Sequence, residues 1–175
     1  MTEPGTAGPP HIGESPFLHG TAGPKTWVTV TNVFLRIDHV GVAVPDLDEA
    51  IAWYGETFGL ASVHEEVNED QGVREAMLAV GDGTTRIQLL APLRPDSAIA
   101  TFLDRHGPGL QQVAYTVEDV EAVAETLRDR GLRVLYEQAR RGTAGSLVNF
   151  VHPKDAGGVL VELVQPASGP APSPH

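Results

Sequence analysis

The sequence contains no cysteine among its 175 residues. This absence excludes disulfide bonds, thiolate metal sites and cysteine nucleophiles, and it fits a protein of a reducing compartment. Long apolar runs are absent too, because no stretch approaches the roughly 20 residues that a membrane-spanning helix needs. The N-terminus lacks the basic segment and the apolar block of a signal peptide. We therefore expect a soluble, cytoplasmic protein with no membrane partner.

Basic residues are scarce relative to acidic ones. The chain has 12 Lys and Arg residues against 23 Asp and Glu residues, which gives a formal net charge of −11. This surplus argues against nucleic acid as the main partner, because phosphate backbones are bound by clustered basic side chains. An anionic substrate would need local cations, and the candidates are Arg74, Arg140, Arg141 and Lys154.

Small residues and proline dominate both ends of the chain, residues 1–26 and 166–175, without a hydrophobic period. Such segments bury too little apolar surface to offset the entropy lost on ordering. We expect a flexible extension over residues 1–34, one domain over residues 35–166 and a flexible tail over residues 167–175. Within the extension, residues 27–34 alternate loosely, as an edge strand or an oligomer contact would.

The first half of the domain predicts a strand, a helix and three further strands. Residues 35–44 alternate in the manner of a strand and end at Pro45. A helix should follow, since Asp46 is a good N-cap, Glu49 stands three residues on, and apolar residues recur at helical spacing until Gly59. Polar turns then separate three strands, which we expect at about 61–67, 74–80 and 85–90.

The second half repeats this order. A strand at 110–117 and a helix at 119–130 precede strands at 132–136, 146–152 and 159–164. Each half is therefore a βαβββ unit, one over residues 35–95 and one over residues 108–166. The predicted fold class is α+β, with two tandem βαβββ modules forming a curved mixed sheet around a cleft.

The repeat also has a register in its polar residues. His39 precedes Gln88 by 49 residues, and Gln112 precedes Glu162 by 50 residues. In each half, one of these residues interrupts the apolar pattern of the first strand and the other interrupts that of the last strand. Two curved halves that face each other would bring all four side chains into one cleft.

These four side chains form a candidate metal site. A buried carboxylate such as that of Glu162 needs a compensating partner, because desolvating a charge is costly. One imidazole nitrogen and three oxygen donors suit an octahedral divalent ion with positions open for substrate, and they favour cobalt, manganese, nickel or a similar ion over a structural zinc. Taken singly, His39 fits a core histidine, and Gln88 and Glu162 fit solvent-facing strand residues. Their shared symmetry favours the metal site.

Two segments have distinctive sequences, Gln-Gly-Val-Arg-Glu at 71–75 and His-Pro-Lys at 152–154. Together with residues 37–44, 68–75, 87–92, 140–145, 150–154 and 158–162, they resemble methylmalonyl-CoA epimerases of the vicinal oxygen chelate (glyoxalase/bleomycin resistance/dioxygenase) superfamily. The resemblance covers about residues 36–166 and is most specific in the first two segments. Members of this fold commonly pair, so we also expect a homodimer.

The resemblance implies that His39, Gln88, Gln112 and Glu162 hold a divalent metal. One of the four positions departs from the family pattern, which has a His-His pair where this chain has Gln111 and Gln112. An amide oxygen is a weaker ligand than imidazole for late transition metals. The substitution implies weaker metal binding, a preference for harder ions, or loss of the original activity.

The implied reaction is metal-dependent epimerisation of (2R)/(2S)-methylmalonyl-CoA or a related alkylmalonyl-CoA, so the implied partner is an acyl-CoA substrate. The metal would stabilise an enolate, and a base would remove the α-proton. The resemblance assigns Glu75 as that base, and Glu162 as a ligand first and a candidate second base. One alternative is another enzyme of the superfamily, of the glyoxalase, dioxygenase or isomerase type, against which the retained Glu75 segment argues. The other is a metal-free small-molecule binding protein of the same fold.

Overall fold

The computed structural model describes residues 32–81 and 83–167. Residues 27–31 of the expected edge strand, most of the expected N-terminal extension and nearly all of the expected tail lie outside these ranges. Residues 32–34 belong to no strand. No helix within the described ranges combines the length and the apolar character required to cross a bilayer.

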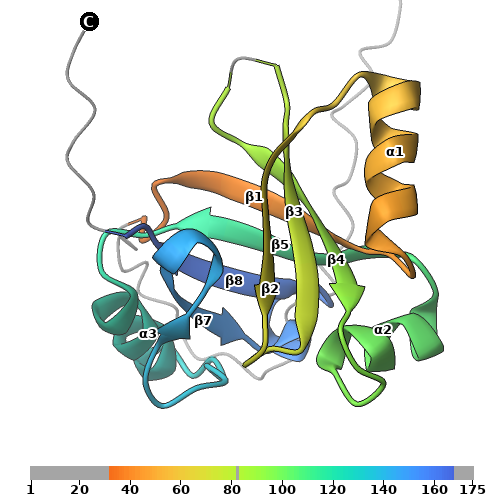
Figure 1. Cartoon of the computed structure of the whole chain (residues 1–175). Coiled ribbons are helices and arrows are strands. Elements are labelled where there is room, and N and C mark those ends of the chain that lie inside the picture. The colour runs from red at the N-terminus through yellow and green to blue at the C-terminus, as the bar shows by residue number, and fades with distance from the viewer. Residues whose placement is uncertain (1–31, 82, 168–175) are drawn as a thin grey trace, which may run out of the picture. The chain divides into compact units, whose positions relative to one another are not determined.

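Two βαβββ modules follow each other along the described part of the chain (Figure 1). The first comprises β1 (Arg36–Ala43), α1 (Leu47–Phe58), β2 (Ser62–Asn68), β3 (Val73–Ala79) and β4 (Arg86–Pro92). The second comprises β5 (Gly109–Thr116), α3 (Val120–Asp129), β6 (Arg140–Arg141), β7 (Leu147–Val151) and β8 (Leu160–Gln165). The helix α2 (Ala98–His106) connects the modules, and two 3-10 turns lie at Thr143–Gly145 and Pro153–Asp155.

One mixed sheet contains all eight of these strands, in the order β2-β3-β4-β1-β5-β8-β7-β6. The first strand of each module runs parallel to the last, as β1 does to β4 and β5 to β8. The modules join through the antiparallel pair β1 and β5. The fold class predicted from the repeat, two βαβββ modules in one curved mixed sheet, is confirmed.

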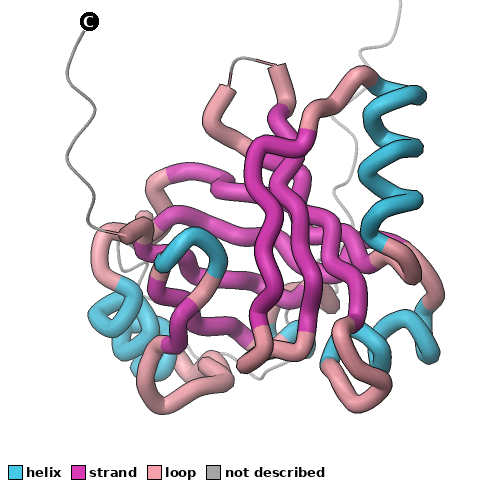
Figure 2. The backbone as a smooth tube through the Cα atoms, in the orientation of Figure 1, coloured by secondary structure: helices cyan, strands magenta, loops and turns pink. Residues whose placement is uncertain are grey.

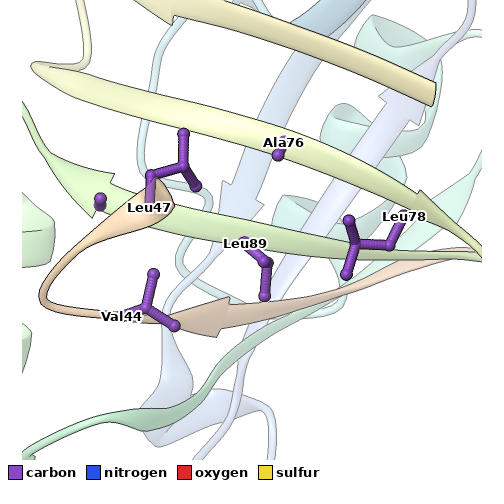
Figure 3. Packing of buried hydrophobic residues seen from close by; sticks show 6 residues of the cluster. Val44, Leu47, Ala76, Leu78 and Leu89 are labelled. Carbon is purple, nitrogen blue, oxygen red and sulfur yellow. The ribbon is translucent and has the colours of Figure 1, made fainter. Parts of the chain in front are cut away.

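Each module packs its helix on the outer face of its own strands, as Figure 2 shows for the helices that flank the sheet. In the first module, Leu47 of α1 belongs to one buried cluster with Ala76, Leu78 and Leu89 of the sheet (Figure 3). In the second, the core includes Val120, Ala124 and Leu127 of α3 together with Val151 and Leu163. Because apolar side chains take the outer face, the inner face is left for the polar residues of each strand.

The capping signals read from the sequence are present. Asp46 accepts a hydrogen bond from the backbone N–H of Glu49 at 2.9 Å, and Gly59 ends α1 in the left-handed conformation with φ 71°. The second helix has the same start, since Asp119 accepts bonds from the backbone N–H groups of Glu121 and Ala122. These caps fix where the chain leaves β1 and β5.

The prediction of a strand at 132–136 was wrong. This segment lies beside β7 but makes only an isolated bridge between Val134 and Val151. The reason is Asn149, whose side-chain amide bonds the backbone N–H and C=O of Tyr136 at 3.1 and 3.0 Å. A side chain thereby replaces the ladder bonds that a neighbouring strand would have supplied.

Candidate active site

The pairing of β1 with β5 brings the four predicted metal ligands together. Gly41 lies opposite both Gln88 and Gln112, and Ala114 lies opposite both Glu162 and His39. Each module therefore contributes one side chain from its first strand and one from its last strand, in matching registers. The spacing of 49 and 50 residues in the sequence is the consequence of this pseudo-two-fold arrangement.

The four side chains are buried and in mutual contact, and we call them the tetrad. The amide nitrogen Nε2 of Gln112 lies 2.6 Å from Glu162 Oε2, 3.1 Å from Gln88 Oε1 and 3.4 Å from His39 Nε2. His39 Nε2 lies 3.1 Å from Glu162 Oε2. The N–H₂ group of Gln112 therefore donates to Glu162 and Gln88 and lies beside His39 Nε2.

The charge of His39 depends on its carboxylate neighbours. Burial lowers its pKa, but hydrogen bonds to Asp38 and Glu162 outweigh burial and raise the pKa to about 9. Asp38 Oδ1 lies 3.1 Å from Nδ1 of the imidazole, and Asp38 Oδ2 accepts a bond of 2.7 Å from Thr116 Oγ1. This support fixes the orientation of the ring, with Nε2 toward the other three residues.

Glu75 lies on the inner face of β3 beside the tetrad and is only 2% exposed. Burial raises the pKa of its carboxyl to about 7. Gln88 Nε2 donates to Glu75 Oε2 at 2.9 Å, and Thr143 Oγ1 donates to Glu75 Oε1 at 2.7 Å. Arg74 points to the opposite face, where it bonds Asp48 of α1 at 3.0 Å. Strand alternation thus places Glu75, and not Arg74, on the side of the tetrad.

A cavity of about 300 Å³ opens over these groups. Its polar wall contains Glu75 and three members of the tetrad, Gln88, Gln112 and Glu162. The apolar wall is formed by residues of both modules and of α2: Val73, Leu90, Ile99, Phe150 and Leu160. A small organic group can therefore reach a buried carboxyl whose pKa lies near neutrality, a combination typical of proton-transfer sites.

Residues 38–150 match the family model of the glyoxalase/bleomycin resistance protein/dioxygenase superfamily. The chain belongs to this superfamily, within its methylmalonyl-CoA epimerase family. The mitochondrial methylmalonyl-CoA epimerase of Bos taurus is 42% identical over 132 residues, which are 74% of each chain. The crystal structure of methylmalonyl-CoA epimerase from Mycobacterium tuberculosis is 56% identical, with a TM-score of 0.76 over 81% of this chain and 94% of that one. A solved methylmalonyl-CoA epimerase in complex with methylmalonyl-CoA and NH4+ is 48% identical, with a TM-score of 0.76 over 79% of this chain and 99% of that one.

Epimerases of this superfamily typically use a divalent metal, and the tetrad has the donors for one. Adjacent ligands of an octahedral ion lie roughly 3 Å apart, because each bond is about 2.1 Å. The 3.1 Å between His39 Nε2 and Glu162 Oε2 matches that separation. Gln112 offers a further oxygen if its amide turns to exchange Oε1 for Nε2. Within the described ranges no group of three His, Cys, Asp or Glu side chains is suited to a metal, so a metal here depends on the two glutamines.

The cations proposed for an anionic substrate are dispersed. Arg74 is paired with Asp48 on the outer face, away from the cavity. The guanidinium of Arg140 lies 3.9 Å from the ring centre of Tyr136, which lines the cavity. Arg141 and Lys154 lie on β6 and on the turn at Pro153–Asp155, outside the cavity wall. Of these four cations, Arg140 therefore contacts the cavity wall, at the ring of Tyr136.

Thr143 is a site residue that the sequence did not single out. It lies in a 3-10 turn of the second module, yet it bonds Glu75 and Gln88 of the first. The turn is anchored where the backbone N–H of Ala144 donates to Glu66 at 3.0 Å. The only sequence signal for Thr143 is its place in the segment at 140–145 that resembles the epimerases. That resemblance does not identify the carboxylate that Thr143 bonds.

Gly41 provides space for the tetrad. A Cβ atom there would lie 2.5 Å from Gln112 Cγ. Gly41→Ala should lower the free energy of unfolding by about 1–3 kcal/mol, the usual cost of overpacking, and displace Gln112. Urea denaturation measures the first effect.

Gly55→Ala is the matched control, since its Cβ would meet nothing closer than 3.6 Å, at Leu60 O. In the interior of α1 this change should raise the free energy of unfolding by ~0.5–1 kcal/mol. Equal midpoints for the two variants would mean that Gly41 does not hold the space for Gln112.

Proposed function

We propose that this chain epimerises (2R)/(2S)-methylmalonyl-CoA, or a related alkylmalonyl-CoA, with a divalent cation held by His39, Gln88, Gln112 and Glu162. The observation that carries the proposal is the position of Glu75. It is a buried carboxyl with a pKa raised to about 7, and it lies in the same cavity wall as three of the four donors. Similarity to methylmalonyl-CoA epimerases along most of the domain supports the same substrate class.

Epimerisation needs a base within reach of the α-carbon, between the thioester and the carboxylate. Glu75 takes the proton, while the bonds from Gln88 Nε2 and Thr143 Oγ1 hold its carboxylate in place. A divalent ion, when bound, stabilises the enolate charge as a Lewis acid. The apolar walls at Leu90 and Phe150 exclude water from the carbanionic centre.

A second group must return a proton to the opposite face. Glu162 is the candidate, because among the carboxyl groups of the cavity wall it is the one that belongs to the tetrad. Its Oε2 is engaged by Gln112 and His39. We therefore assign Glu162 as a ligand first and as a base second.

The test is α-proton exchange. Purified protein loaded with Co²⁺ or Mn²⁺ is mixed with (2S)-methylmalonyl-CoA in D₂O, and mass spectrometry and a stereospecific coupled assay follow label and configuration. Deuterium uptake together with loss of stereochemical purity is the expected result. A metal-loaded protein that binds the thioester without exchange would refute the proposal.

A metal-free binding protein is the second candidate, and one observation favours it. The N–H₂ group of Gln112 already donates to Gln88 Oε1 and Glu162 Oε2, and His39 Nε2 lies 3.1 Å from Glu162 Oε2, so the tetrad is hydrogen-bonded without a cation. Metal analysis of the purified protein separates the two functions, because only the epimerase requires bound metal. A homodimer and a cytoplasmic location stay predictions.

Gln112→His should tighten binding of late divalent metals by ~10- to 100-fold and raise the exchange rate. An imidazole nitrogen binds such ions better than an amide oxygen. Histidine also has no N–H₂ group to occupy the space between the other three metal ligands. The pseudo-symmetric residue, His39, shows that this strand position accepts the ring. Isothermal titration with Co²⁺ measures the affinity, and Gln138→His on the exposed surface controls for adventitious binding by an added histidine.

Two outcomes would change this interpretation. If the parent protein turns over substrate and the variant binds metal no more tightly, Gln112 is adapted to the reaction as it stands. If neither protein exchanges the proton, the binding function becomes the better assignment.

A further inference from the structure

The ladder between β1 and β5 contains two register shifts, one just before His39 and one just after Gly41. The first leaves Asp38 without a partner in the ladder, and the second leaves Gln111 without one. Each of these residues directly precedes a member of the tetrad, His39 or Gln112. Because a bulge redirects the side chains around it, both residues occupy positions from which a tetrad member can be supported.

Asp38 provides such support in the first module. Its Oδ1 lies 3.1 Å from His39 Nδ1, and its Oδ2 accepts a hydrogen bond of 2.7 Å from Thr116 Oγ1. Arg36 is paired with the same Oδ2 at 3.2 Å. A carboxylate beside Nδ1 keeps a proton on that nitrogen and leaves Nε2 as the atom that can bind a metal. The ring therefore cannot turn without breaking bonds to a carboxylate that is itself held in place.

The second module lacks all three of these supports. His39 and Gln112 are separated by 73 positions. At the same separation, the counterparts of Arg36, Asp38 and Thr116 are Gly109, Gln111 and Ala43. The ladder confirms this equivalence, because it pairs the two outer residues in each case, Arg36 with Thr116 and Gly109 with Ala43.

The counterparts cannot do what the first module does. Gly109 has no side chain, and Ala43 has only a methyl group in place of a hydroxyl. Gln111 is an amide, and its buried Oε1 has no hydrogen-bond partner among the described residues. The second module therefore has no carboxylate in the position that Asp38 takes in the first.

We propose that Asp38, held by Thr116, is the positioning residue that makes His39 a metal ligand, and that the second module is built without this support for an amide ligand. This inference rests on the metal site of the proposed function. The partner of a ligating imidazole commonly changes metal affinity by ~10- to 100-fold. An amide has no second ring nitrogen to hold, so Gln112 needs no carboxylate at position 111.

The first arm of the test removes the support of His39. Asp38→Asn should weaken binding of Co²⁺ by ~10- to 100-fold, because one carbonyl oxygen cannot replace both carboxylate oxygens. Thr116→Val should weaken it by ~2- to 10-fold, the effect of one hydrogen bond, and Thr116→Ser, which keeps the hydroxyl, should restore it. Isothermal titration measures the affinity, and the visible spectrum of bound Co²⁺ reports the ligand set.

Asp155→Asn is the matched control. The Asp155 carboxylate is also engaged by three groups, the backbone N–H and two guanidinium nitrogens of Arg133, but it belongs to the turn at Pro153–Asp155. This variant should lower the melting temperature and leave Co²⁺ affinity unchanged. If Asp38→Asn and Thr116→Val do the same, Asp38 has a structural role only and the proposal is overturned. The Thr116 pair decides the matter if Asp38→Asn does not fold.

The second arm transfers the support to the other module. Gln111→Asp combined with Gln112→His should bind Co²⁺ about tenfold more tightly than Gln112→His alone. Gln111→Asp alone should bind no more tightly than the parent, because residue 112 then has no ring N–H to hold. An equal gain in both backgrounds would show that the added carboxylate acts through its charge and not through positioning, and would overturn the proposal.

The proposed activity and the positioning role fail in different ways. If the parent binds Co²⁺ in a manner that depends on Asp38 but exchanges no α-proton, the epimerase assignment fails and the positioning role stands. If the parent exchanges the proton while Asp38→Asn and Thr116→Val bind Co²⁺ as the parent does, the positioning role fails alone. A parent that binds no Co²⁺ overturns the positioning role whatever its activity.

Discussion

Glu75→Gln should slow α-proton exchange by at least ~100-fold while the protein keeps its fold and its bound metal. A positioned base contributes this much in proton-transfer enzymes, and an amide cannot accept the proton. The change removes one charge and almost no volume. It also leaves a carbonyl oxygen to accept the bond from either Gln88 or Thr143. The exchange rate in D₂O, with metal content and circular dichroism measured on the same sample, provides the comparison.

Glu66→Gln is the matched control. Glu66 lies opposite Glu75 in the β2–β3 ladder, but its carboxylate bonds His64 and the backbone N–H of Ala144, and it does not line the cavity. Exchange by this variant should stay close to the parent rate. Parent-like exchange by Glu75→Gln would remove Glu75 from the mechanism, and equal losses in both variants would indicate a general electrostatic effect of this strand pair.

The sequence predicts the fold well where the signal is local or repeated. The caps at Asp46 and Asp119 and the apolar spacing after them locate α1 and α3 to within a residue or two of their observed ends. Local signals do not indicate that β1 and β5 occupy equivalent places in the fold. The repeat does indicate it. The helix α2 was not predicted, although its cap Ser97 and the spacing of Ile99 and Phe102 are visible once the region is considered by itself.

The candidate site shows a similar division. His39, Gln88, Gln112 and Glu162 are brought together by strand register, and register follows from the repeat. The partners of each side chain depend on contacts between distant segments, which the spacing does not encode. Thr143 meets Glu75 only because the turn around Ala144, whose φ is 53°, folds across from the second module. Gln111, whose buried amide oxygen has no hydrogen-bond partner among the described residues, likewise lies at a bulge that the apolar pattern of β5 does not reveal.

Glu162→Ala should weaken binding of a divalent metal by at least ~100-fold and abolish measurable turnover. Glu162 is the only carboxylate of the tetrad, and the three remaining donors are two neutral amides and an imidazole. Neutral amide oxygens alone are poor ligands for transition ions, so the loss of the anionic donor removes most of the affinity. Metal content after dialysis and titration with Co²⁺ measure the effect.

The structure also predicts what the rest of the site does in this variant. Without Glu162 Oε2, Gln112 Nε2 loses its shortest hydrogen bond, and His39 loses the partner at 3.1 Å that helps to raise its pKa. Glu162→Gln distinguishes these losses from the loss of charge, because it keeps a carbonyl acceptor in the same volume. Glu137→Ala, at an exposed position outside the cavity, should leave metal binding unchanged. Full metal content in Glu162→Ala would contradict the four-residue site, because the ion would then be held by groups other than this carboxylate and its three neighbours.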